Sequence, residues 1–363
     1  MPDLVALDLP GGAGFVDELR RAWDQGDAVA PVDRRLPPAA LEAHLAALRP
    51  TVIVDESGRR ALEGDPVDAG DALVVATSGT TGAPRGVVLT HDALVAAARA
   101  TSAALEVDPA VDRWLACLPL AHVGGLSVVT RALLTGTPVD VHDGFDARAV
   151  DASSATLVSL VPAVLGRIDT TAFRRILLGG SAIPADRPAN SVATYGMTET
   201  GGGVVYDGHP LADVEVRAVD GELQLRGPQL LRCYRDGSDP RTADGWFPTG
   251  DGGSVTDGSV RVTGRLTEVI VTGGEKVWPG PVERLLETHP AVAEAAVIGR
   301  DDTEWGRAVT AVVVPADPAT PPTLGELRWL VKDTLPPWCA PRALELVDTL
   351  PRTALGKVRR HDL

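Results

Sequence analysis

The stretch Ala72-Leu-Val-Val-Ala-Thr-Ser-Gly-Thr-Thr-Gly-Ala-Pro-Arg-Gly86 says more about the fold than any other part of the chain. It opens with an apolar run typical of a buried β-strand. The ten residues that follow contain four hydroxyl side chains, three glycines, one proline and one arginine. Glycine lets backbone N–H groups approach a ligand, hydroxyls can donate to phosphate oxygens, and Arg85 adds positive charge. The stretch therefore predicts a strand followed by a phosphate-binding loop, with a flexible surface loop as the alternative.

Strand and helix signals alternate from about residue 70 to residue 200. Thr90 precedes a helical stretch that has Asp92 in its first turn, a pattern typical of an N-cap followed by an acid. Such alternation favours a parallel sheet with crossover helices. The predicted strands of this region are 72–76, 114–118, 155–160 and 175–178.

Hairpin signals replace this alternation between residues 211 and 263. Asp220-Gly221 and Asp257-Gly258 each separate two strand-like runs, and this dipeptide is typical of a tight hairpin turn. After Arg265 the sequence predicts strands 268–272, 293–298 and 308–314 and helices 281–288 and 324–334. We therefore expect an α/β protein. A large N-terminal domain (1–265) holds parallel sheets with crossover helices and a β-rich subdomain, and a small α+β C-terminal domain (266–363) follows.

The composition argues against several classes of protein. A net charge of −15 makes nucleic acid a poor partner, because that binding depends on neutralising phosphates. No apolar run approaches the length of a membrane span, and the first residues carry acids where a secretory signal carries bases. The three cysteines are widely separated, which argues against a disulfide framework or a zinc site. We expect a cytoplasmic protein with small-molecule substrates, and the sequence leaves a homo-oligomer open.

Four more segments hold unusual combinations of residues. Leu177-Leu-Gly-Gly-Ser-Ala-Ile183 is a strand that ends in two glycines, where a flat ring could lie against the backbone. Tyr195-Gly-Met-Thr-Glu-Thr200 places an aromatic ring, a glycine, hydroxyls and an acid close together, which an ordinary turn explains poorly. The other two are Trp246-Phe-Pro-Thr-Gly-Asp251, followed by Gly264-Arg265, and Pro351-Arg-Thr-Ala-Leu-Gly-Lys357. Each of these except the tyrosine segment would, alone, more often be a turn or a surface feature.

Together and in this order, the segments resemble those of the acyl-adenylating superfamily, which includes acyl-CoA synthetases, peptide-synthetase adenylation domains and luciferases. The resemblance covers residues from about 72 to the end. It implies that the protein uses ATP and CoA as substrates and Mg²⁺ as a cofactor. It also implies that the C-terminal domain is mobile. Attack of a carboxylate on a phosphate ester brings two anions together, so a metal and hydrogen-bond donors must screen the charge. Mg²⁺ takes few protein carboxylates, so one glutamate suffices.

The resemblance also implies a role for each matching residue. Tyr195 would pack on adenine, Thr198 would bond the α-phosphate, Glu199 would hold Mg²⁺, Asp251 would bind the ribose, and Lys357 would bridge carboxylate and phosphate oxygens. The implied nucleotide-binding residues are Thr77, Ser78, Gly79, Thr80, Thr81, Gly82, Arg85, Gly179, Gly180, Ser181, Tyr195, Gly196, Thr198, Asp251 and Arg265. The implied catalytic residues are Lys357, Thr198, Glu199 and His122, and the acyl group would contact His122, Gly180, Ser181 and Met197. Gly273, Gly274 and Lys276 would serve the CoA half-reaction, and Thr267 would be the hinge.

Three departures from the family pattern stand out. Arg85 stands where the family usually has a lysine. Thr267 stands where the family usually has an acid or a lysine. In addition, only about seventy residues precede the phosphate loop, which is fewer than the family usually has. The compact layout and the stretch Pro119-Leu-Ala-His-Val-Gly-Gly-Leu126 resemble the short o-succinylbenzoate–CoA ligases of actinobacterial menaquinone synthesis. In that resemblance His122 gates or polarises the acyl site, whereas a satisfied core histidine is the alternative.

The resemblance implies a two-step, AMP-forming CoA ligase. A carboxylic acid attacks ATP to give an acyl-AMP, and CoA then takes the acyl group. The compact layout and the stretch around His122 suggest o-succinylbenzoate as this acid. The alternatives are another small aryl- or acyl-CoA ligase, an enzyme that loads a carrier protein, and a nucleotide-binding protein without catalysis.

Overall fold

The computed structural model describes residues 1–78, 84–352 and 358–363. The chain forms two compact units. Unit 1 comprises Met1–Val216 and Leu225–Phe247, and unit 2 comprises Arg217–Gln224 and Pro248–Leu363. The domain boundary expected at residue 265 stays a prediction.

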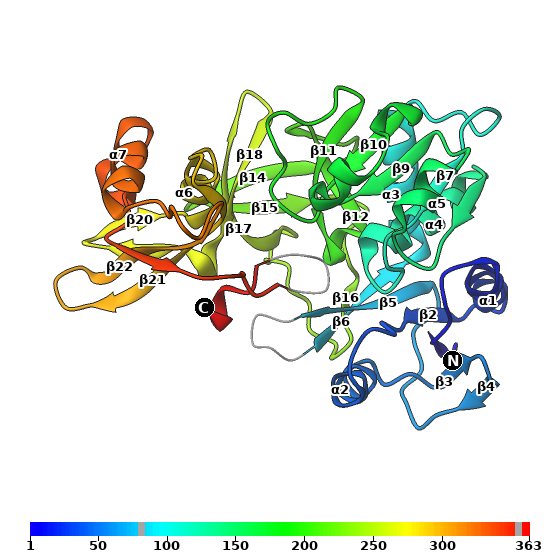
Figure 1. Cartoon of the computed structure of the whole chain (residues 1–363). Helices are drawn as coiled ribbons and strands as arrows, with labels where there is room; N and C mark the ends of the chain where they lie inside the picture. The colour runs from blue at the N-terminus through cyan, green and yellow to red at the C-terminus, as the bar shows by residue number, and fades with distance from the viewer. Residues whose placement is uncertain (79–83, 353–357) are drawn as a thin grey trace. The chain divides into compact units, whose positions relative to one another are not determined.

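The first sheet of unit 1 is mixed, with the strand order β16-β6-β5-β2-β1-β3-β4 (Figure 1). Its elements are β1 (Leu4–Leu7), β2 (Ala28–Pro31), β3 (Val52–Asp55), β4 (Gly58–Ala61), β5 (Asp71–Ser78), β6 (Pro84–Thr90) and β16 (Cys233–Tyr234), with helices α1 (Ala13–Asp24) and α2 (Pro38–Leu48). Strands β1, β2, β3 and β5 run parallel, whereas β6 returns antiparallel beside β5. The predicted strand at 72–76 is therefore confirmed as part of β5, and it opens a hairpin with β6.

The second sheet of unit 1 has the order β13-β12-β11-β10-β9-β7-β8. Its strands are β7 (Trp114–Ala116), β8 (Val139–Val141), β9 (Leu157–Leu160), β10 (Arg175–Leu178), β11 (Ser191–Met197), β12 (Gly202–Tyr206) and β13 (His209–Pro210). The five neighbouring strands β8, β7, β9, β10 and β11 pair in parallel. Strands β12 and β13 extend the sheet beyond β11 by antiparallel pairing. The predicted parallel sheet is confirmed, with one correction. The 72–76 strand belongs to the first sheet, because its backbone pairs with β2 and β6.

Helices connect these strands. They are α3 (His91–Ala104), α4 (Val123–Thr135) and α5 (Ala147–Asp151), with short 3₁₀ turns η1 (Pro162–Arg167), η2 (Thr170–Ala172) and η3 (Thr198–Thr200). Thr90 caps α3 as predicted, since its Oγ1 accepts a hydrogen bond from the Ala93 N–H at 3.2 Å. Helices α3 and α4 pack against each other, and α4 also packs against β7 and β9.

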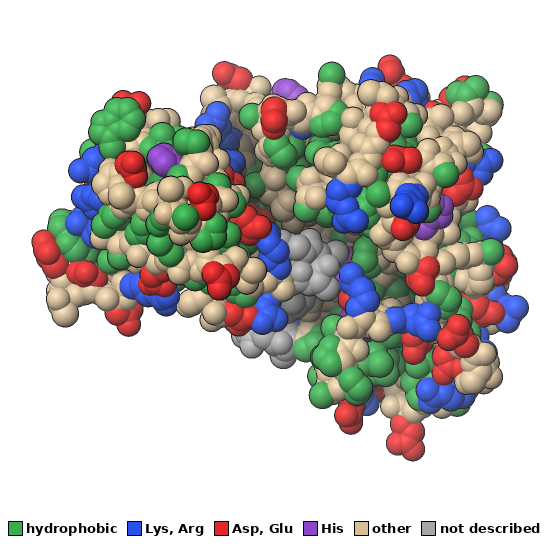
Figure 2. Space-filling view, in the orientation of Figure 1, with side chains coloured by type: hydrophobic (Ala, Val, Ile, Leu, Met, Phe, Trp, Pro, Cys, Tyr) green, Lys and Arg blue, Asp and Glu red, His purple; other side chains and the backbone are tan. Residues whose placement is uncertain are grey.

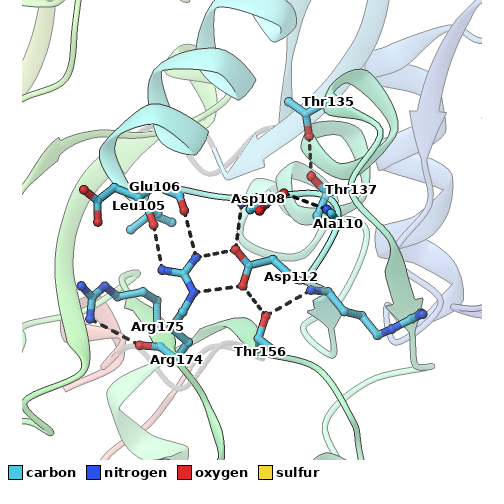
Figure 3. Close-up of polar contacts among 11 residues, drawn as sticks. Leu105, Glu106, Asp108, Ala110, Asp112, Thr135, Thr137, Thr156, Arg174 and Arg175 are labelled. Carbon is cyan, nitrogen blue, oxygen red and sulfur yellow. Dashed lines mark hydrogen bonds and ion pairs between the residues drawn. The ribbon is translucent and has the colours of Figure 1, made fainter.

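An ion pair closes the amino ends of the parallel strands (Figure 3). Arg174, just before β10, donates through Nε and Nη2 to the Asp112 carboxylate at 2.9 and 2.6 Å. Thr156, just before β9, donates to the same carboxylate at 2.7 Å. Burial acts to raise the pKa of Asp112, but the hydrogen bonds from Arg174, the Asp108 N–H and Thr156 together outweigh it and lower that pKa. The network ties three strand beginnings together on the edge opposite to the predicted site.

A four-stranded sheet follows in the order β14-β15-β17-β18. Its strands are β14 (Glu215–Val219), β15 (Glu222–Arg226), β17 (Phe247–Thr256) and β18 (Ser259–Arg265). Both predicted hairpin turns are confirmed: φ is 52° and 84° at Asp220 and Gly221, and 51° and 77° at Asp257 and Gly258. Asp207-Gly208, between β12 and β13, has the same conformation, with φ of 48° and 82°. This third Asp-Gly turn was not predicted, although it contains the same dipeptide.

The C-terminal part of unit 2 is α+β, as predicted. Its elements are η4 (Leu266–Glu268), β19 (Ile270–Thr272), β20 (Glu275–Val277), α6 (Pro279–Leu286), β21 (Val292–Asp302), β22 (Gly306–Pro315), α7 (Leu324–Thr334), η5 (Pro337–Cys339), β23 (Ala343–Leu346) and η6 (Arg360–Asp362). The predicted strand 268–272 is shorter, because residues 266–268 form a 3₁₀ turn. Strand β23 was not predicted; it lies parallel to β22 and completes a three-stranded sheet.

Charged side chains are distributed over the surface. Acidic and basic groups are interspersed on the face drawn in Figure 2. Many of them pair within one unit, as Arg226 does with Glu215 at 2.6 Å and Arg300 with Glu345 at 2.7 Å. Across the described ranges, no helix combines the length and apolar character needed to cross a bilayer.

Candidate functional site

Two predicted segments lie at the carboxyl ends of neighbouring parallel strands. Gly179, Gly180 and Ser181 follow β10, and Thr198 and Glu199 follow β11 in the turn η3. Strands β10 and β11 pair in parallel, so both segments lie on the carboxyl side of the second sheet. In open α/β sheets this edge is where ligands bind.

Close backbone packing explains two of the glycines at this edge. A Cβ on Gly179 would lie 2.6 Å from Thr194 Oγ1, and a Cβ on Gly196 would lie 2.0 Å from the Gly202 carbonyl oxygen. Thr194 uses the same hydroxyl to donate to the Leu178 carbonyl at 3.0 Å. These glycines keep β10, β11 and β12 tightly joined, which leaves backbone exposed at the strand ends.

Thr200, which was not among the predicted site residues, shapes the turn that presents Thr198 and Glu199. Its side chain is fully buried, and its Oγ1 accepts from the Met197 N–H at 3.0 Å. The same hydroxyl lies 2.6 Å from the Gly202 carbonyl, to which it can donate. Thr198 and Glu199 are only half-buried, so the turn holds its backbone from the inside and leaves these two side chains accessible.

The phosphate-loop hairpin begins at Thr77 and returns at Arg85, which are register partners at the ends of β5 and β6. Gly79, Thr80, Thr81, Gly82 and the side chain of Ser78 lie outside the described part of the structure. The Arg85 guanidinium stacks over the Tyr234 ring at 3.7 Å and donates to Ser238 Oγ at 2.9 Å. A lysine could not make both of these contacts, because its ammonium is not planar and cannot stack flat on the ring while it donates a hydrogen bond to a second residue.

Tyr234 connects this hairpin to the acid turn. Its hydroxyl donates to Glu199 Oε1 at 3.1 Å, while its ring carries the Arg85 guanidinium. It lies on β16, which pairs with β6, and the nearby Leu231 N–H donates to the Glu199 carbonyl at 2.7 Å. Burial, together with the Glu199 carboxylate, raises the pKa of Tyr234 and keeps its hydroxyl protonated as a donor. No sequence pattern pointed to Tyr234, because its partners are distant along the chain.

The arrangement at Glu199 fits a magnesium ion. Tyr234 occupies Oε1, and among the described residues no hydrogen bond to Oε2 is found. Over that part of the chain, no group of three or more His, Cys, Asp or Glu side chains gathers as a metal site. Mg²⁺ needs no such group, because it takes one or two carboxylates and fills its other positions with phosphate oxygens and water.

His122 lies at the N-cap of α4 and is half-buried. Its Nε2 is 3.3 Å from Asp33 Oδ2 and 3.1 Å from Arg35 Nη2. Asp33 and Arg35 follow β2 in the first sheet, and neither was predicted as a site residue. These contacts fit a histidine at the acyl site and also the alternative of a satisfied core histidine, so both stay predictions.

Unit 2 brings together two other predicted residues. Asp251 on β17 and Arg265 on β18 are register partners, and Arg265 Nε lies 3.0 Å from Asp251 Oδ1. Arg265 also donates through Nη1 to the Thr249 carbonyl at 3.0 Å. The indole of Trp278 covers Gly252, where a Cβ would lie 2.0 Å from the ring. Asp251 is buried and its orientation is fixed by these neighbours.

The remaining predicted residues also lie in unit 2. Thr267 is exposed in η4, and Gly273 and Gly274 form the β19–β20 turn with φ of 56° and 85°. Lys276 is exposed on β20. Lys357 lies outside the described residues, but Arg352 and Val358, on either side of that segment, pair as an antiparallel bridge. The roles assigned to all these residues stay predictions.

Comparison with known proteins agrees with this architecture. Residues 57–235 match the model of the AMP-binding enzyme family, and residues 281–357 match the model of the AMP-binding enzyme C-terminal domain. A probable 2-succinylbenzoate–CoA ligase of Mycobacterium tuberculosis is 40% identical over 329 residues, which cover 82% of this chain and 85% of the relative. The chain belongs to the AMP-binding enzyme family.

Other AMP-binding enzymes extend the comparison. An indoleacetate–CoA ligase of Aromatoleum aromaticum is 36% identical, covering 80% of this chain and 66% of the relative. The o-succinylbenzoate CoA synthetase of Bacillus subtilis, in complex with ATP and magnesium ion, has a TM-score of 0.86 at 28% identity and covers 99% of this chain and 89% of its own. A second structure of that enzyme, with its acyl-adenylate intermediate, has a TM-score of 0.86 at 26% identity, covering 99% and 87%.

Proposed function

We propose that this AMP-binding enzyme is an ATP-dependent o-succinylbenzoate–CoA ligase of menaquinone biosynthesis, which forms AMP. The observation that carries the proposal is the contact chain Arg85–Tyr234–Glu199, which joins the phosphate hairpin of the first sheet to the acid turn of the second. The relative named probable 2-succinylbenzoate–CoA ligase, 40% identical over 82% of this chain, supports the choice of substrate.

In the first half-reaction, a carboxylate oxygen of the acid attacks the α-phosphorus of ATP, and pyrophosphate leaves with the bonding electrons. The phosphate hairpin and Thr198 bind phosphate oxygens, while Glu199, held by Tyr234, supplies the protein ligand for magnesium. When bound, the ion neutralises charge on the phosphates. Lys357 bridges the attacking carboxylate and the phosphate.

In the second half-reaction, the CoA thiolate attacks the acyl carbon, and AMP leaves with the electrons of the broken carbon–oxygen bond. Thr267 would be the hinge that replaces Lys357 by the turn at Gly273 and Gly274, whose φ values are 56° and 85°, and Lys276 beside that turn would serve the reaction with CoA. Glycines suit a narrow channel for pantetheine because they carry no side chains. One enzyme thereby catalyses both steps, and we expect it to be cytoplasmic.

A screen of carboxylic acids tests the proposal. Purified protein is incubated with ATP, Mg²⁺ and each acid, with and without CoA, and AMP, pyrophosphate and the thioester are measured. We expect o-succinylbenzoate to give CoA-dependent AMP release at a higher kcat/KM than indoleacetate or benzoate.

The outcomes separate the alternatives. Preference for indoleacetate would indicate another aryl-CoA ligase, an activity that the relative from Aromatoleum aromaticum makes a specific second candidate. Thioester formation on a carrier protein but not on CoA would indicate a loading enzyme. Absence of pyrophosphate exchange with every acid would leave only a nucleotide-binding protein.

A further inference from the structure

An ion pair from the first sheet reaches the histidine at the start of α4. Arg35 donates through Nε to Asp33 Oδ1 and through Nη2 to Asp33 Oδ2, both at 2.7 Å. The same Nη2 lies 3.1 Å from His122 Nε2. Asp33 is almost completely buried, with its side chain 7% exposed, so this pair is a built part of the interior rather than a surface contact.

The chemistry of arginine decides which ring nitrogen carries the proton. A guanidinium has donors only, so its contact with Nε2 is favourable when that nitrogen offers its lone pair. The neutral imidazole then carries its hydrogen on Nδ1. Asp33 Oδ2 also lies 3.3 Å from Nε2 and could accept from it, but a hydrogen on Nε2 would then face the Arg35 Nη2 donor, which is closer at 3.1 Å. Within the described residues, no hydrogen bond to Nδ1 is found, so this donor is available to a ligand.

The surrounding charges also favour a neutral ring. Burial lowers the pKa of His122, Asp33 opposes that effect, and Arg35 lowers the pKa again. His44 of α2 is the other titratable side chain coupled to this cluster, and burial lowers its pKa as well. A half-buried histidine between these groups stays uncharged near neutral pH.

We propose that Asp33 and Arg35 are positioning residues that fix His122 as the neutral Nδ1–H tautomer, so that its ring donates a hydrogen bond to a carboxyl or keto oxygen of the acyl substrate. This proposal rests on the function proposed above. It assigns the first-sheet strand β2 a part in acid recognition, because Asp33 and Arg35 follow β2 directly.

The tautomer can be measured without turnover. Long-range ¹H–¹⁵N correlation spectra of the full-length ¹⁵N-labelled protein distinguish the two tautomers and the charged ring, and His122→Gln assigns the signal. We expect Nδ1–H in the wild-type protein. In Arg35→Gln the proton moves to Nε2, where Asp33 can accept it, or the ring becomes charged at a higher pH. Arg34→Gln is the matched control, because Arg34 makes ion pairs with Asp8 and Glu56 and, within the described part of the chain, contacts no histidine.

Steady-state kinetics give the second readout. We expect Arg35→Gln to raise the KM for o-succinylbenzoate about tenfold, the effect of one hydrogen bond to a charged group, with the KM for ATP changed less than about twofold. The acidic limb of the pH profile should move to higher pH, whereas Arg34→Gln should match the wild type. An Nε2–H ring in the wild type, or an acid KM that does not change although the tautomer does, overturns the proposal. If the wild type fails to use o-succinylbenzoate at all, the proposed function fails, and the spectra still decide the tautomer.

Discussion

Replacing Tyr234 with phenylalanine separates the two contacts that this residue makes. The ring, and with it the Arg85 stack at 3.7 Å, remains, while the hydroxyl that donates to Glu199 Oε1 at 3.1 Å is lost. A hydrogen bond to a charged acceptor contributes about 1.5 kcal/mol at the low end of its range, which suits a half-exposed site. That energy corresponds to about a tenfold change in an equilibrium constant.

The expected defect is in magnesium use. Glu199 without its donor samples more orientations, so we expect the Mg²⁺ concentration for half-maximal adenylation to rise about tenfold in Tyr234→Phe. Pyrophosphate exchange, titrated with Mg²⁺ at saturating ATP and acid, measures this. At saturating Mg²⁺ the rate should recover to within a few-fold of the wild type, because the phosphate hairpin keeps its stacked arginine.

Tyr206→Phe is the matched control. Tyr206 is buried on β12 and its hydroxyl lies 3.0 Å from Thr101 Oγ1, so this variant also loses one tyrosine hydrogen bond but leaves Glu199 untouched. Its magnesium dependence should equal that of the wild type. An unchanged magnesium dependence in Tyr234→Phe, or an equal shift in both variants, would refute the reasoning that Tyr234 orients the metal-binding carboxylate.

Three further predictions concern the other unit, the opposite sheet edge and the acid range. Lys357→Ala should abolish acyl-AMP formation but spare thioester formation from supplied acyl-AMP; equal loss in the two half-reactions, each followed by product chromatography, would contradict the division of labour. Arg174→Met should lower the free energy of unfolding by about 3 kcal/mol in urea titrations, because it leaves the buried Asp112 carboxylate uncompensated, while the KM values stay unchanged; a shifted KM would argue that this edge contributes to the site. Burial acts to raise the pKa of Asp33, but the hydrogen bonds from Arg35 lower it from 3.8 to about 2. The ionised carboxylate therefore stabilises the fold above pH 3.8, and this stabilisation is lost as the pH falls toward about 2. The difference in unfolding free energy between wild type and Asp33→Asn should therefore shrink from about pH 4 downward in urea titrations; a difference that is constant with pH would exclude this linkage.

Local signals in the sequence determined the elements and the motifs. The Asp-Gly turns at 220 and 257 and the Thr90 cap were predictable because each depends on the conformational preferences of a few adjacent residues. The parallel pairing in the second sheet from residue 114 on was predictable as well, since strands that alternate with helices favour it, whereas the order of the strands was not predicted. The motif at residues 195–200 identified the acid turn for the same reason: its chemistry is written within one short segment.

Only the tertiary structure decided which distant residues meet. The strand at 72–76 belongs to the first sheet because it pairs with β2, whose residues precede it by more than forty positions and carry no motif. Tyr234 meets Glu199, and Arg35 meets His122, across separate sheets. Such contacts follow from the packing of the two sheets, and this packing joins segments that are distant along the chain. The chain contains three tyrosines and many arginines, and only burial and geometry select the one that orients a functional side chain.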